Sequence, residues 1–200
     1  MPVDDVKQGF APDAGERLPM PSADAMSDAQ RASARALIDG PRQGVFGPFL
    51  PLLRSPRLLD GIASTGEYLR FDCVLPVDVR ELAACAVARH TSNQFEWVMH
   101  APLAIKAGVA QSALDSLQAG ARPKELTAQQ EAALDFTREM LGTHGVSDET
   151  YAQALAGFGE QGVVELATLA GYFAMVCWVM NIARTPARPS DTKPLGAFPQ

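Results

Sequence analysis

Three side chains suited to acid–base chemistry lie within the stretch ELAACAVARHTSNQFEWVMHAPLAIKAG, residues 81–108. Glu96 and His100 are four residues apart, so a helix would place them on one face, one turn from each other. Glu81 lies in the apolar segment that precedes them. A carboxylate beside an imidazole in apolar surroundings can move protons, because the imidazole titrates near neutral pH and its neighbours shift its pKa. The spacing therefore predicts an acid–base centre.

The same residues also allow structural interpretations. A histidine on an apolar helix is often a core residue whose hydrogen bonds are satisfied. Glu81 is either a solvated glutamate in the first turn of a helix, favoured by the helix dipole, or a buried carboxylate with a partner. His90 ends its helix, where the dipole alone would stabilise a cationic imidazole. Four cationic residues could bind an anionic substrate, although residues of this kind are usually surface charges. They are Arg70, Arg89, Lys106 and Arg184.

Composition narrows the class of protein. The 200 residues are 47% hydrophobic, which suits one globular domain with a core, and the net charge of −6 argues against nucleic acid or an anionic membrane as a partner. The first twenty residues are charged and lack an apolar run, so we expect no signal peptide and a cytoplasmic protein. Cys73, Cys85 and Cys177 are widely spaced in apolar sequence and predict buried, reduced thiols. No metal-ligand spacing occurs, and we expect neither a metal nor another cofactor.

The chain is expected to be all-α, because no alternating strand pattern exceeds four residues. Ser22 is expected to cap the first helix, Gly40 and Pro41 to end it, and an ordered loop to follow. Pro102 predicts a kink or a break in the helix that carries Glu96 and His100. The expected helices cover about 22–38, 55–70, 76–90, a fourth capped by Thr91, Ser92 or Asn93 and running to 108, then 109–120, 127 onward, 147–157 and 160–184.

One segment resembles a membrane span in length. The stretch Val163–Ile182 is apolar, but Glu165 and Asn181 bound its uninterrupted part and basic residues do not flank both ends. A helix that is apolar all round can also be the buried centre of a bundle or an oligomer. We expect the buried helix and no membrane partner.

The stretch from Glu81 onward resembles the carboxymuconolactone decarboxylase family, within the alkylhydroperoxidase D-like superfamily. The resemblance runs from about Gly40 to Pro189 and includes SPRLLDGIASTGEYLRFDCVLPVDVRELA, VSDETYAQALAGFGEQGVVEL and GYFAMVCWVMN. Members are all-α and typically form trimers or hexamers, so the resemblance implies a homo-oligomeric helical bundle. It also implies an organisation into an N-terminal arm with a short helix (1–39), a family domain (40–189) and a C-terminal tail (190–200).

The resemblance breaks at two positions. Peroxidase members of the superfamily carry Glu, eleven residues, Cys, two residues, Cys, three residues, His. Counted from Glu81, the two cysteine positions hold Asn93 and Glu96, and the final position holds His100. Peroxide reduction in those members needs a thiolate and a resolving thiol, so the sequence predicts that this chain is not a thiol peroxidase.

The retained acid–base residues resemble the decarboxylase branch, which acts on a carboxylated muconolactone of aromatic catabolism without a cofactor. By this resemblance His100 would donate a proton or stabilise the enolate, Glu96 would orient His100 or share its proton, and Glu81 would complete the relay. The substrate pocket would be lined by His90, Asn93, Gln94 and Trp97.

Other functions remain open at this point. The same acid–base residues could isomerise, hydrate or hydrolyse a related unsaturated acid or lactone. A residual redox protein would use Cys85 or Cys177 with a partner thiol. A non-catalytic oligomeric protein would bind a small molecule without turnover.

Overall fold

The computed structural model describes residues 15–196 and is all-helical, with no β-strand in that range. Residues 1–14 of the expected arm and the last four of the expected tail lie outside the described residues. A short 3-10 helix covers Ala23–Ala25. The α-helices are α1 (Asp28–Asp39), α2 (Phe49–Leu52), α3 (Pro56–Phe71), α4 (Val77–His90), α5 (Gln94–Lys106), α6 (Gln111–Gln118), α7 (Ala128–Thr143) and α8 (Asp148–Ala183).

Local capping explains most of these bounds. The side chains of Thr127 and Ser147 accept hydrogen bonds from backbone N–H groups at the starts of α7 and α8, where the sequence predicted helices to begin. The first helix was predicted wrongly: Ser22 makes no capping hydrogen bond and precedes only the 3-10 turn. Ser27 instead forms a capping box with Gln30, so α1 begins five residues later than Ser22 would place it.

The loop after α1 and the expected break at Pro102 differ from the prediction. The loop after α1 contains the short helix α2, because the sequence FLPL follows Pro48 with apolar residues that pack into the core. Helix α5 runs through Pro102 without a break. Pro102 lies on the exposed side of α5, so its ring does not disturb the packing of the buried side.

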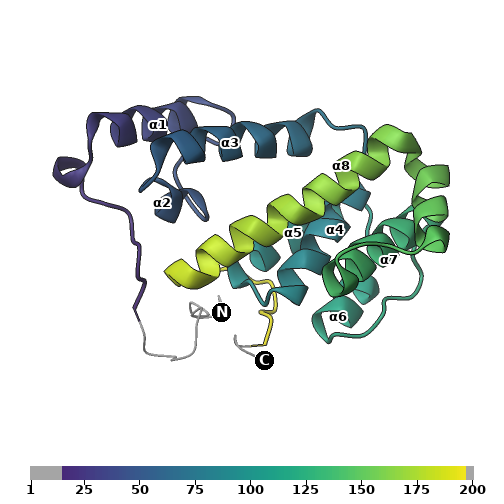
Figure 1. Ribbon diagram of the computed structural model, residues 1–200. Coiled ribbons are helices and arrows are strands. Elements are labelled where there is room, and N and C mark those ends of the chain that lie inside the picture. The colour runs from purple at the N-terminus through teal and green to yellow at the C-terminus, as the bar shows by residue number, and fades with distance from the viewer. Residues whose placement is uncertain (1–14, 197–200) are drawn as a thin grey trace.

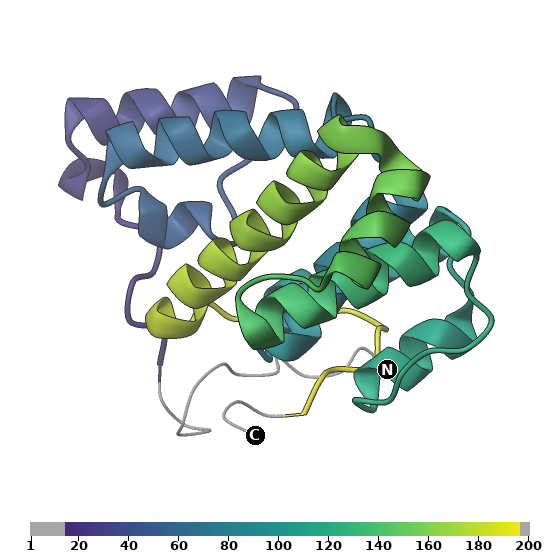
Figure 2. The same cartoon turned by 45° about the vertical axis from the view of Figure 1, so that its right-hand side comes forward.

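Helix α8 is the central element (Figure 1), and it crosses α4, α7, α3 and α2. Helices α4 and α5 form an antiparallel hairpin behind it, while α1 and α3 lie side by side as a second layer (Figure 2). The carboxylate of Glu165 on α8 joins the two layers. It accepts hydrogen bonds from the Tyr68 hydroxyl on α3 and from the Val74 amide in the α3–α4 turn.

A break divides α8 into the two helices that the sequence predicted. Gly159 adopts φ 69° and ψ 177°, which lie outside the helical region and favour glycine. Helix α8 is long and apolar enough to cross a membrane by length and composition. In the most apolar window of α8, however, 56% of the residues are buried inside the fold.

Candidate acid–base site

The α4–α5 connection fixes the position of the site. The chain turns through Thr91 and Ser92, and the side chain of Asn93 accepts a hydrogen bond from the Glu96 amide at 2.9 Å. Asn93 also donates to the side-chain oxygen of Asn181 on α8 at 2.7 Å. This cap starts α5 at a fixed register against α4 and α8, so that His100 faces back toward α4.

His100 lies between two carboxylates. Its Nδ1 is 2.6 Å from Oε2 of Glu81 on α4, and its Nε2 is 3.0 Å from Oε2 of Glu96, one turn earlier on α5. The ring edge packs against Phe173 of α8, with 4.8 Å between the ring centroids. All three acid–base side chains are at most 13% exposed, so the contacts form in surroundings with little water. The buried alternative for Glu81 is therefore the correct one.

The carboxylates determine the charge of His100. Burial alone would lower its pKa, but the hydrogen bonds and negative charges of Glu81 and Glu96 raise the pKa to about 9. The imidazole is then protonated at neutral pH and donates from both ring nitrogens. A protonated histidine of this kind can act as a general acid.

A small cavity lies against this pair of helices. Its volume is about 40 Å³, and its wall includes Glu96 and His100 from α5, Arg70 from α3 and Arg42 from the loop after α1. Glu81 does not line the cavity and contacts His100 from the side of α4. The apolar and aromatic remainder of the wall comprises Phe46, Pro48, Phe49, Phe95, Met99, Leu103, Tyr172, Phe173 and Val176. We call this space the inner cavity.

The structure does not bring the predicted pocket residues to the inner cavity. His90 is exposed at the end of α4 and lines a separate hollow with Arg89 and Arg138. Gln94 is buried and binds backbone groups of Leu195 and Gly196. The indole N–H of Trp97 donates to the Lys193 carbonyl. Together with the cap Asn93, these contacts hold the hairpin to α8 and to the C-terminal segment. Trp97 also lines a separate hollow beside α6 and that segment.

The inner cavity contains residues that the sequence interpretation did not select. Arg42 was not a candidate, because it lies in a loop rich in Gly and Pro whose path is set by packing. Tyr172 and Phe173 lie in an apolar helix, where periodicity alone does not say which side faces a cavity. The only usable signal was the apolar content of the loop around Val45 and Phe46, which predicted an ordered loop.

The cysteines are poorly suited to redox chemistry. Cys85 and Cys177 are fully buried and unpaired. Burial, together with the negative charge of Glu96 and, for Cys85, of Glu81, raises the thiol pKa of both residues well above its usual value. A thiolate is the reactive form, so both thiols are disfavoured as nucleophiles. Among the residues described, no group of three or more His, Cys, Asp or Glu side chains is placed to hold a metal ion.

The sequence model of the carboxymuconolactone decarboxylase family matches residues 56–139, the segment that contains Glu81, Glu96 and His100. This segment, and with it the acid–base residues, matches the carboxymuconolactone decarboxylase family. A comparison with curated proteins gave no significant match.

Solved structures share the fold of this chain. An uncharacterised peroxidase-related protein from Ralstonia eutropha JMP134, with an alkylhydroperoxidase AhpD core, has a TM-score of 0.69 at 20% identity over 88% of this chain and 93% of its own. An uncharacterised peroxidase-related protein from Silicibacter sp. TM1040 has a TM-score of 0.68 at 17% identity over 91% of this chain and 95% of its own. The debrominase Bmp8, solved as a variant in complex with 2,3,4-tribromopyrrole, has a TM-score of 0.65 at 11% identity over 86% of this chain and 91% of its own.

Proposed function

We propose that this protein is a cofactor-independent acid–base enzyme acting on a small unsaturated carboxylic acid or lactone, with decarboxylation as the leading reaction. One observation carries the proposal. A protonated histidine, held between two carboxylates, lies in the wall of an otherwise largely apolar cavity. Such a group delivers a proton where water is scarce, which is what quenching a carbanion or enolate requires.

The chemistry balances without an added reagent. The bond between the substrate carbon and its carboxylate breaks, carbon dioxide leaves, and the electron pair enters a conjugated carbonyl as an enolate. The positive charge of His100 stabilises that enolate. A proton then passes to carbon from His100, or from Glu96 after His100 has donated to it, and solvent restores it. Isomerisation of a related lactone uses the same donor, and it remains the alternative reaction at this site.

We also propose that this chain forms a homo-oligomer through helix α8. Helix α8 carries an exposed row of mostly apolar or small residues at alternating spacings of four and three, which is the pattern of a helix–helix seam. Within it Val164, Trp178 and Ile182 are 65%, 60% and 63% exposed. We infer that a second copy of this chain covers the row, in keeping with the trimers or hexamers typical of the family. We call the row Val164, Thr168, Gly171, Met175, Trp178 and Ile182 the α8 seam.

A direct assay tests the proposed reaction. Wild-type protein is mixed with 4-carboxymuconolactone, and substrate loss and carbon dioxide release are followed together. His100→Gln, which keeps a polar side chain but cannot act as an acid, should lower kcat by roughly 10²- to 10⁴-fold. Circular dichroism establishes that the variant is folded, and His90→Gln serves as the matched control. Turnover by His100→Gln at the wild-type rate would exclude His100 as the acid.

A further inference from the structure

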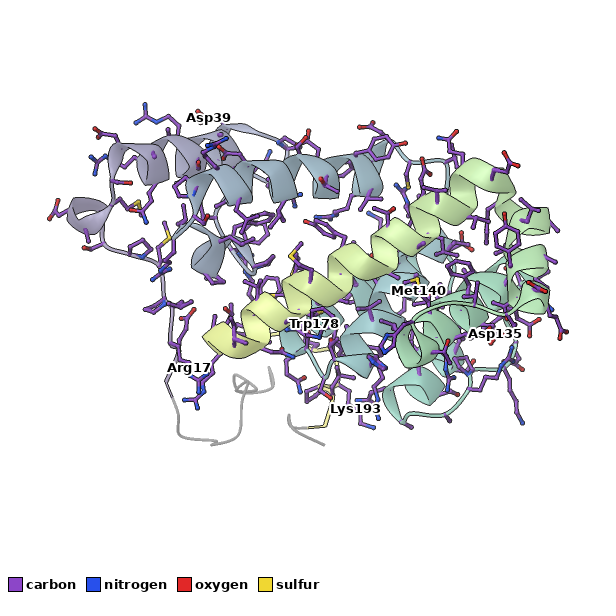
Figure 3. All side chains as sticks on the ribbon, in the orientation of Figure 1. Arg17, Asp39, Asp135, Met140, Trp178 and Lys193 are labelled. Carbon is purple, nitrogen blue, oxygen red and sulfur yellow. The ribbon has the colours of Figure 1, made fainter. Side chains whose placement is uncertain are left out.

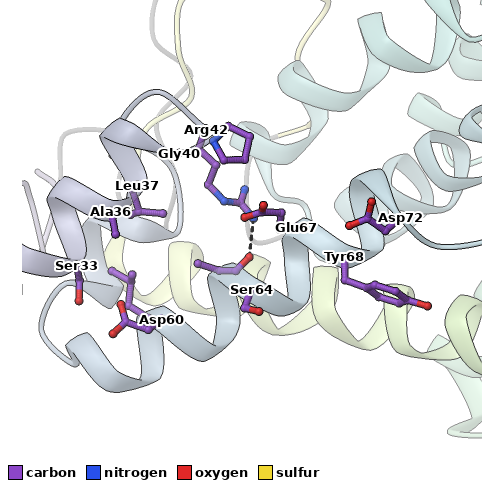
Figure 4. A pocket seen from close by; sticks show the side chains of 13 residues that line it. Ser33, Ala36, Leu37, Gly40, Arg42, Asp60, Ser64, Glu67, Tyr68 and Asp72 are labelled. Atoms are coloured by element: carbon purple, nitrogen blue, oxygen red, sulfur yellow. Dashed lines mark hydrogen bonds between the residues drawn. The ribbon is translucent and has the colours of Figure 1, made fainter.

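Arg42 connects two spaces in the structure. It lines the inner cavity beside His100, and it also lines an open cleft of about 420 Å³ between α1 and α3. Figure 4 shows its guanidinium reaching from the loop after α1 toward α3, with Glu67 beside it. One guanidinium nitrogen donates to the Ala63 carbonyl at 3.1 Å, and the group stacks 4.5 Å from the centre of the Phe49 ring.

These contacts leave Arg42 incompletely satisfied. Its Nε is buried and has no hydrogen-bond partner, and no ion pair joins Arg42 to a carboxylate among residues 15–196. The Tyr172 hydroxyl lies against the guanidinium, and the two groups are accommodated by Gly66 of α3. A Cβ on Gly66 would lie 2.1 Å from the Tyr172 oxygen and 3.0 Å from Nη2 of Arg42. The guanidinium is half-buried, and a buried N–H without a partner is costly unless a ligand such as an anion accepts its hydrogen bond.

The charges around the inner cavity favour an anion inside it. Its charged lining residues are Arg42, Arg70, the imidazolium of His100 and the single carboxylate of Glu96. The outer cleft has the opposite balance, because Arg42 there faces Asp60, Glu67 and Asp72. A small anion is therefore stabilised in the inner cavity and repelled by the outer cleft.

We propose that Arg42, assisted by Arg70 and Tyr172, binds a carboxylate of the substrate in the inner cavity and so holds the reacting carbon beside Glu96 and His100. This assignment rests on the proposed function and adds a substrate-positioning residue to it. An arginine that pairs with the departing carboxylate would stabilise the ground state and slow the loss of carbon dioxide. The carboxylate held by Arg42 is therefore one that stays on the molecule after carbon dioxide has left.

Binding of a non-reactive probe tests the anion site separately from the reaction. Crotonate is titrated into ¹⁵N-labelled protein, with crotonamide as the neutral control. The side-chain signals of His100 are assigned by comparison with His100→Gln. They should shift when crotonate is added and keep their positions when crotonamide is added. Those of the exposed His90 and His144 should not move. No crotonate-dependent shift at His100 in the folded wild type would overturn the anion site.

Matched variants identify the arginine. Arg42→Gln should weaken crotonate binding about tenfold or more, because a charge-assisted hydrogen bond is lost, whereas Arg42→Lys should weaken it less. Arg70→Gln provides a second variant if Arg42→Gln is unstable, and it should weaken binding in the same direction. Arg122→Gln removes an arginine that pairs with Asp135 on the surface and should bind crotonate as wild type does.

The outcomes separate the two proposals. If crotonate binds through Arg42 but 4-carboxymuconolactone is not turned over, the anion site stands and the proposed reaction fails. If the lactone is turned over while Arg42→Gln and Arg70→Gln both bind crotonate as wild type does, the reaction stands and the anion site is wrong. With 4-carboxymuconolactone as substrate, Arg42→Gln should raise KM far more than it lowers kcat. A loss confined to kcat would contradict binding of a carboxylate that stays on the molecule.

Discussion

Oε2 of Glu81 lies 2.6 Å from Nδ1 of His100, although the two residues are 19 positions apart and on different helices. Glu96 binds the other ring nitrogen from within the same helix as His100. Only Glu96 of these two carboxylates lines the inner cavity. The two glutamates therefore have different tasks: Glu81 sets the ring orientation and charge, while Glu96 can also contact a ligand.

Replacing each glutamate by glutamine separates these tasks. Both Glu81→Gln and Glu96→Gln remove a negative charge beside the imidazolium, so both should lower the pKa of His100 and move the alkaline limb of the rate profile to lower pH. Only Glu96→Gln should also lower the plateau value of kcat, by roughly 10²-fold, because it removes a group at the cavity. Full pH–rate profiles measure both effects. A larger plateau loss in Glu81→Gln would reverse the assignment.

The charge of His100 also makes stability depend on pH. Its pKa is about 9 in the folded protein and 6.5 in the unfolded chain. A raised pKa gives a stabilisation that is complete below 6.5 and is lost as the pH rises through about 9. The free energy of unfolding should therefore fall between these values by at most about 3 kcal/mol. Urea unfolding across this range measures the slope, which should be much smaller in His100→Gln. An equal slope in both proteins would show that another group is responsible.

The acid–base centre could be predicted from sequence because its geometry is mostly local. Glu96 and His100 share a helix face at a spacing of four residues, and the short α4–α5 turn brings Glu81 opposite them. Capping residues such as Thr127 and Ser147 act through their own neighbours, so they also marked helix starts correctly. Ser22 failed as a marker because Ser27, five residues later, forms the stronger reciprocal cap.

The cavity wall could not be predicted, because it depends on packing between distant segments. Arg42 reaches α3 and α8 from a loop, and nothing in its sequence neighbours fixes that path. Trp97 and Gln94 looked like pocket residues because they flank Glu96, yet α5 turns them toward the C-terminal segment. Residues adjacent in sequence point to different sides of a helix, so closeness to a catalytic motif is a poor guide to a pocket.

Thiol accessibility tests the redox alternative. Cys85 and Cys177 are fully buried, whereas Cys73 is partly exposed. A colorimetric disulfide reagent should titrate at most one thiol in the native protein and three after denaturation, and Cys73→Ser should abolish the native reaction. Hydrogen peroxide should not be consumed catalytically with a dithiol reductant. Rapid oxidation of Cys85 or Cys177, located by peptide mass analysis, would revive the redox interpretation.

The α8 seam predicts self-association. Trp178, labelled in Figure 3, is 60% exposed on a helix whose other faces form the core, so water contacts a large aromatic surface in the single chain. Covering it with a second copy is favourable, and a charge placed there would have to be buried. Light scattering after gel filtration should find an oligomer for wild type and a smaller species for Trp178→Glu at equal concentration. Ile38→Glu, at an exposed position on α1, is the matched control and should behave as wild type does. A monomeric wild type, or an unchanged oligomer in Trp178→Glu, would mean that the α8 seam is not an interface.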